Sequence, residues 1–245
     1  MVIILCGRQS ANTCYLCLKP MSETEYPALS EIKATQVNVT DGRRLRSRDS
    51  KRKIVSAMLE LVREGRVAPT ADEVAQRANV GLRTVFRRFK DMESLYAEMS
   101  VAISEKVAPI IDERLEHDEW WKNFAQLVER RIRMYEIIMP YRIAANALKF
   151  QSTILHARHR EMVRDERERL VAALPEFILQ DSVLAEALEA ALSFDMWNQL
   201  RNDQKLSVTK AGDVVYRLVG QLLPEAKLTR TKESPGGAID GYPDI

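Results

Sequence analysis

The side chains best suited to binding a partner are gathered in the segment "LRTVFRRFK", residues 82–90. At helical spacing, one face of this segment carries Arg83, Thr84, Arg87 and Arg88. Arginine can donate two hydrogen bonds to a phosphate or to the O6/N7 edge of guanine. Threonine can donate a hydrogen bond to a phosphate or pack its methyl group against the thymine methyl. These residue types suit a DNA duplex, although arginines on a short helix can also form only a solvated face.

The residues just before this face predict a helix and a tight turn that would position it. Thr70 followed by Glu73 is a capping box, in which each residue's side chain bonds the backbone N–H of the other. The helix that starts there is expected to stop near Ala78, because Asn79 tolerates a left-handed backbone and Gly81 completes a turn. Two short helices about a turn of three or four residues have helix-turn-helix dimensions.

A third helix is predicted from "SKRKIVSAMLELVREG", residues 50–65, whose apolar residues share one face and whose Gly65 ends it. The basic run "RRLRSRDSKRK", residues 43–53, comes at its start. Between Arg43 and Lys90 there are fourteen Lys and Arg against five Asp and Glu, a local charge of +9 in a chain of net +2. The run is interpreted as a phosphate-binding arm, with a solvated linker as the alternative.

Residues 48–107 resemble the DNA-binding domain of the tetracycline-repressor (TetR) family in three ways: the support helix ending in Gly, the Thr-capped helix, and the aromatic pair Phe86 and Phe89. Departures are Phe86 in place of the usual Tyr, Gly81 in place of a Ser or Thr cap, and Met92 in place of a Lys that Lys90 could replace. The resemblance and the residue chemistry together predict seven DNA-binding residues: Thr70, Arg83, Thr84, Phe86, Arg87, Arg88 and Lys90.

The rest of the chain predicts only helices, so the expected fold class is all-α. A long helix continues from the aromatic pair to about Ile111, and another from 118 to 139 is expected to end at Pro140, where a further helix to about 150 begins. The predicted organisation is an N-terminal extension and basic arm without regular structure (1–46), a helix-turn-helix domain (47–107), a helical ligand-binding and dimerisation domain (108–223) and a disordered tail (224–245).

Large apolar side chains in the middle helices are core residues by default. The family resemblance implies that part of this region lines a cavity for a small inducer, which is typically apolar with a few polar anchors. The candidate ligand-binding residues are Phe124, Met134, Tyr135, Tyr141 and Phe150.

Two C-terminal helices are predicted at about 182–201 and 207–223. The second carries an apolar stripe at Ala211, Val214, Val215, Leu218, Val219 and Leu222. Such a stripe can pack on its own domain, but the resemblance implies that both helices pair with a second copy in a four-helix bundle.

Other functions find little support in the residues. Motifs of hydrolases, zinc proteases and phosphate-binding loops are missing, so no enzyme activity, metal or cofactor is predicted. His156 and His159 lack a third ligand, and Cys14 and Cys17 have no partners for a zinc site beyond Cys6. Residues 1–20 are interpreted as an upstream extension of the reading frame. No run of about 18 apolar residues exists, so no membrane span is predicted.

The expected function is a cytoplasmic, homodimeric regulator that binds a palindromic double-stranded DNA operator and is released by an unknown small-molecule ligand. A repressor is favoured. The alternative is a helical dimer that senses a ligand or binds a protein without reading DNA.

Overall fold

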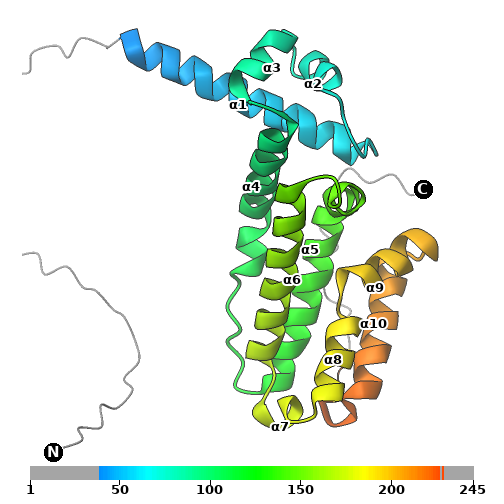
Figure 1. Cartoon of the computed structure of the whole chain (residues 1–245). Helices are drawn as coiled ribbons and strands as arrows, with labels where there is room; N and C mark the ends of the chain where they lie inside the picture. The colour runs from blue at the N-terminus through cyan, green and yellow to red at the C-terminus, as the bar shows by residue number, and fades with distance from the viewer. Residues whose placement is uncertain (1–38, 227, 229–245) are drawn as a thin grey trace, which may run out of the picture. The chain divides into compact units, whose positions relative to one another are not determined.

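The computed structural model describes residues 39–226 and residue 228, and every regular element among them is helical (Figure 1). The all-α class predicted from the sequence is confirmed. In this part of the chain, no helix has the length and apolar character needed to cross a bilayer. The α-helices are α1 (Val39–Arg63), α2 (Ala71–Arg77), α3 (Leu82–Arg88), α4 (Met92–Ile111), α5 (Trp120–Leu148), α6 (Thr153–Ala173), α7 (Glu176–Leu179), α8 (Ser182–Ala191), α9 (Phe194–Asn198) and α10 (Val208–Leu222).

Helices α1 to α4 bury a first apolar core, to which α5 contributes Tyr141. Ile54 and Met58 of α1 and Leu95 of α4 are completely buried. Because burial of apolar area is the main favourable term in folding, these contacts hold the short helices α2 and α3 in place. A seven-residue helix is too short to be stable alone.

A second core lies among the later helices, with α5 packed against α4, α6 and α9. Phe124 and Leu127 of α5 and Trp197 of α9 are buried in it. Helix α4 belongs to both cores, because Met99 packs in the first and Val107 in the second. One continuous helix therefore joins the helix-turn-helix segment to the rest of the described chain.

Helix α5 runs through Pro140, so the predicted helix end at this residue is wrong. Proline removes the hydrogen bond to the carbonyl four residues back and normally breaks a helix. Here the residues on both sides, Ile138, Met139 and Tyr141, are only 4–7% exposed, and their burial holds the helix together. The start also differs, since α5 begins at Trp120 and not at residue 118.

The helix predicted at 182–201 is two helices. Helix α8 ends at Ala191, and Ser193 then caps α9 by accepting a hydrogen bond from the Met196 amide. A π-helical turn, Gln199–Asp203, follows α9. The predicted tail at 224–245 is corrected at its start, because Pro224–Ala226 form a 3-10 turn and Ala226 is 1% exposed. Residues 1–38, 227 and 229–245, with the three cysteines, lie outside the described residues.

Candidate functional site

The turn between α2 and α3 has the geometry that its residues predict. The Thr70 hydroxyl accepts a hydrogen bond from the Glu73 amide at 3.2 Å, and the Glu73 carboxylate accepts one from the Thr70 amide at 2.8 Å. These hydrogen bonds lower the pKa of Glu73 from its usual value, because they stabilise the ionised carboxylate. Asn79 has a φ of +50°, the left-handed conformation expected of it, and Gly81 precedes the first residue of α3.

Helix α3 has one buried and one exposed face. Val85 is 2% exposed and Phe89, directly after the helix, is 3% exposed, so both anchor α3 in the first core. Phe86 is 51% exposed, and Arg83 and Arg87 also face outward. Packing therefore fixes the helix while leaving the opposite face free to contact a partner.

The cations on the outer face differ in what they already contact. Arg83, Arg87 and Lys90 are exposed and form no ion pair with any described residue. Thr84 is half-buried beside them. Unpaired exposed guanidinium groups keep all their N–H donors for a partner, which is what contact with phosphate or guanine requires.

The prediction that Arg88 belongs to the outer face of α3 is corrected. Its Nη1 donates to the Ser47 hydroxyl on α1, and its Nε is buried without an acceptor among the described residues. Arg88 therefore fastens the end of α3 to α1. The Thr70 hydroxyl is similarly engaged, since it also donates to Glu73 at 2.9 Å.

The basic run at residues 43–53 is helical, because α1 extends from Val39 to Arg63, and the prediction of an arm without regular structure is corrected. Ser47 holds this part of α1 beside the last turn of α3, through its hydrogen bond with Arg88. Lys51 forms an ion pair with Glu98 of α4. Arg44, Arg48 and other exposed basic side chains of α1 thus extend the positive surface of α3.

An ion pair that sequence reasoning missed fixes α2 on α1. Arg77 donates from two guanidinium nitrogens to the two carboxylate oxygens of Glu64, each at 2.7 Å. The bond with Arg77 lowers the pKa of Glu64. Residues 13 apart in sequence can be paired only once the angle between the two helices is known, so the sequence carried no signal for this contact.

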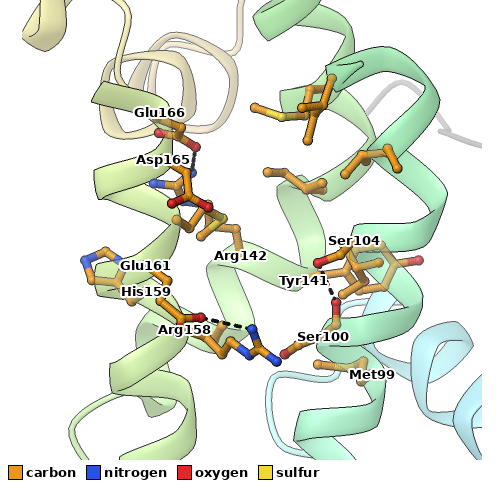
Figure 2. A pocket seen from close by; sticks show the side chains of 18 of the residues that line it. Met99, Ser100, Ser104, Tyr141, Arg142, Arg158, His159, Glu161, Asp165 and Glu166 are labelled. Carbon is orange, nitrogen blue, oxygen red and sulfur yellow. Dashed lines mark hydrogen bonds and ion pairs between the residues drawn. The ribbon is translucent and has the colours of Figure 1, made fainter. Parts of the chain in front are cut away.

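A cavity of about 360 Å³ lies between α4, α5 and α6 (Figure 2). Its apolar lining comes mainly from α4 and α5 and includes Ile103, Val107 and Ile138. Helix α6 supplies most of the charged lining. Among the labelled residues, Ser100 and Ser104 lie on the α4 side, and Asp165 and Glu166 on the α6 side.

The five predicted ligand-binding residues fall into three environments. Met134 and Tyr141 line the cavity. Phe124 and Tyr135 are buried at 0% and 2% exposure and lie outside its lining. Phe150 is 82% exposed, so its prediction as a lining residue is corrected: it follows the end of α5, where neither core reaches it.

A buried polar cluster at the cavity wall was not predicted. Arg142 Nη1 donates to Glu166 Oε1 at 2.5 Å, and the Tyr135 hydroxyl lies within donating distance of both the Leu192 carbonyl at 3.0 Å and Glu166 Oε2 at 3.2 Å. Arg131 donates to the backbone carbonyls of Glu166 and Leu192. Burial, and then the Glu166 charge, raise the pKa of Tyr135, which therefore stays protonated.

The described residues contain no group of three His, Cys, Asp or Glu that could hold a metal. His156 and His159 lie on α6, and His159 faces Lys149, whose Nζ is 3.5 Å from its Nε2. Burial, followed by the charge of Lys149, lowers the pKa of His159.

Helices α8 and α10 lie side by side, as Figure 1 shows. The predicted stripe on α10 divides between two environments. Ala211, Val215 and Val219 are buried in the chain's own core, whereas Leu218 is 38% exposed and Val183 of α8 is 78% exposed. Part of the apolar surface of this helix pair is therefore uncovered in the single chain.

Two solved structures resemble this arrangement, while no protein-family model and no curated protein matches the chain. A transcriptional regulator from Rhodococcus sp. RHA1 matches with a TM-score of 0.55 and 18% identity, over 74% of this chain and 99% of that one. The chain has the fold of this transcriptional regulator. At this identity the likeness shows the fold alone. A TetR transcriptional regulator from the same organism matches over the same shares, with 16% identity and a TM-score of 0.40 that is too low to support an inference.

Proposed function

We propose that the chain is a sequence-specific DNA-binding transcriptional regulator that acts as a homodimer. The observation that carries this proposal is the outer face of α3, where Arg83 and Arg87 are exposed and form no ion pair with a described residue, while Val85 and Phe89 anchor the helix. The regulator fold, with its capped helix-turn-helix, supports the same reading. A rigid short helix that presents free arginine forks suits insertion into the major groove.

The DNA contacts divide by role. Arg83, Thr84, Phe86 and Arg87 contact bases and the sugar-phosphate chain in the groove, and Lys90 binds a flanking phosphate. Thr70 and Arg88 complete the predicted set, and their own hydrogen bonds within the chain limit them to holding the helices and touching the backbone of the duplex. The helical basic surface of α1 neutralises phosphates alongside α3.

Dimerisation places two α3 helices in successive major grooves. The uncovered apolar surface of α8 and α10 pairs with its copy in a second chain and forms a four-helix bundle. A two-fold dimer reads a near-palindromic operator whose half-sites lie about 34–36 Å apart.

The small-molecule ligand binds in the cavity between α4, α5 and α6. Because α4 packs in both cores, a ligand that favours one position of α4 also changes the separation of the two α3 helices. The protein then dissociates from the operator if the ligand prefers one form of the dimer. In that form the separation of the two α3 helices no longer matches the spacing of the major grooves. A repressor that is released by its ligand is the regulator that this arrangement supports.

Salt-dependent binding to duplex tests the DNA-binding proposal. Fluorescence anisotropy with a labelled 30-base-pair duplex is measured between 50 and 300 mM salt for the wild-type protein and for Lys90→Ala. A steep log–log slope is expected, and loss of one phosphate contact makes it shallower by about one ion. Arg160→Ala is the matched control, since Arg160 is an exposed arginine on α6 and should leave the slope unchanged. Absence of binding at 50 mM salt would reject the proposal.

A further inference from the structure

An arginine that lines the cavity has a buried hydrogen-bond donor with no acceptor among the described residues. Arg142 is 6% exposed and lines the cavity. Its Nη1 is bonded to Glu166, and its guanidinium lies 4.5 Å from the centre of the Phe194 ring. Its Nε has no hydrogen-bond partner among the described residues.

An unmatched donor of this kind calls for an oxygen atom. Leaving a buried polar group without a hydrogen bond destabilises the structure, and an arginine cannot relieve this by losing its proton. Glu166 bonds Arg142 through Nη1, and no oxygen of the described residues, including those of Glu166, forms a hydrogen bond with Nε.

A second unmatched atom belongs to the same cavity lining. His159 Nδ1 is buried and has no partner among the described residues. Its other nitrogen, Nε2, lies 3.5 Å from Lys149 Nζ. An ammonium group only donates, so Nε2 takes the role of acceptor and Nδ1 carries the proton of the neutral ring. Both unmatched atoms are therefore N–H donors, which favours an acceptor in the ligand.

Three of the four carboxylates of the lining are already engaged with arginines, whereas Asp112, exposed at the end of α4, forms no ion pair with any described residue. Glu166 is paired with Arg142, and Glu161 accepts from Arg158 at 2.9 Å (Figure 2). Asp165 lies 3.5 Å from Arg164. Beside Arg142, a ligand cation would therefore have to displace an existing ion pair, whereas an oxygen acceptor meets a donor that has no acceptor among the described residues.

We propose that the cavity takes an amphipathic ligand whose carbonyl or carboxylate oxygen accepts from Arg142 Nε, with an apolar body against Ile103, Val107 and Ile138. This names the ligand class of the regulator and so rests on the proposed function for its biological role. A cavity of about 360 Å³ is at the small end of ligand sites, which run from about 300 to 1,000 Å³. The apolar body is accordingly short, an alkyl chain or a single ring system.

The test measures binding of three probes with the same alkyl chain to the full chain by isothermal titration calorimetry. Decanoate offers a carboxylate, 2-decanone a neutral carbonyl, and decyltrimethylammonium a cation without an acceptor. We expect decanoate or 2-decanone to bind at least about tenfold more tightly than the cation. The assay contains no DNA, so its failure is distinct from failure of the chain to read an operator.

The double variant Arg142→Met/Glu166→Gln removes the donor without leaving a buried carboxylate unpaired. It should lower affinity for the oxygen-bearing probe about tenfold and leave the cation unaffected. Arg160→Met is the matched control, because Arg160 is an exposed arginine of α6 that lies outside the cavity lining. It should change neither affinity.

A direct readout covers the case in which the double variant unfolds. The Nε–H signal of Arg142 in a ¹H–¹⁵N spectrum of the wild-type protein should shift on addition of the oxygen-bearing probe. Tighter binding of the cation, no binding of any probe at millimolar concentration, or an unmoved Arg142 signal at saturation would each overturn the proposal.

Discussion

The outer face of α3 and the wall of the cavity both depend on arginines, but they place them in opposite environments. On α3, Arg83 and Arg87 are exposed and unpaired with described residues. At the cavity wall, Arg142 is 6% exposed, bonded to Glu166 and stacked on Phe194. An exposed charge contributes little to folding and keeps its donors for a partner, whereas a buried charge must be paired to be tolerated at all.

The two regions should therefore respond to substitution in separate ways. Changes on α3 should alter affinity for DNA and leave stability unchanged. Changes at the cavity wall should alter stability first, and ligand binding where the remaining structure holds. The predictions below test this separation, beginning with the largest effect.

Arg142→Ala should destabilise the chain by about 3–5 kcal/mol, because it leaves the buried Glu166 carboxylate without its cation. The free energy of unfolding is measured by urea denaturation followed by circular dichroism. Arg142→Met/Glu166→Gln serves as the control and should recover most of the loss. A single variant as stable as the wild type would show that the pair is not buried in solution.

Arg87→Ala should weaken binding to an operator obtained by selection from random duplexes. The expected loss is about 1–3 kcal/mol, the value of a good arginine contact with a base. The same variant should unfold at the wild-type urea concentration, because Arg87 makes no ion pair with described residues. Affinity is measured by anisotropy at fixed salt. A variant that lost stability as well as affinity would break the separation between the two regions.

Much of the helix-turn-helix could be predicted because its signals are local. Thr70 and Glu73 are three residues apart, and Asn79 takes the left-handed conformation within the same turn. The cavity wall had no such signal, since Arg142 and Glu166 are 24 residues apart and meet only when α5 packs on α6. Pro140 was misread because a local helix-breaking rule competed with burial on both sides of it.

The same reasoning explains the residues that were misplaced. Residue type predicted that Arg88 faces outward with its neighbours. Its guanidinium instead donates a hydrogen bond to the hydroxyl of Ser47, 41 positions earlier. Phe150 was grouped with core aromatics by composition, yet it follows the end of α5 and is 82% exposed. Spacing along one helix gives a face, and only tertiary packing decides what covers that face.

Thr70→Ala should destabilise the helix-turn-helix core by about 1 kcal/mol, the usual effect of removing an N-cap side chain. DNA affinity of the folded protein should fall less than in Arg87→Ala, because the Thr70 hydroxyl is already bonded to Glu73. Thermal unfolding by circular dichroism and anisotropy on the same samples measure both effects. A loss of affinity that matched Arg87→Ala without a loss of stability would place Thr70 among the direct contacts.

The smallest effect expected is a pH dependence of the same cap. The Glu73 pKa is lowered in the folded chain from a usual 4.5, mainly by the hydrogen bond from the Thr70 amide. A lowered folded pKa means that the stabilisation is present above the unfolded value and is lost as pH falls through the folded value. Glu73→Gln keeps an acceptor but does not titrate. The melting temperature of the wild type should therefore exceed that of Glu73→Gln at pH 7, and the two should converge below about pH 4. A difference in melting temperature that does not change with pH would contradict the role given to Glu73.

Selection from a pool of random duplexes tests the central claim most directly. The full chain is mixed with the pool at physiological salt, and the retained duplexes are sequenced after several rounds. The account predicts recovery of a near-palindrome whose half-sites are about one helical turn apart or somewhat more, and loss of that enrichment with Arg83→Ala/Arg87→Ala. Retention without any enriched sequence, or no retention at all, would contradict a DNA-reading regulator and favour a helical dimer that only senses its ligand.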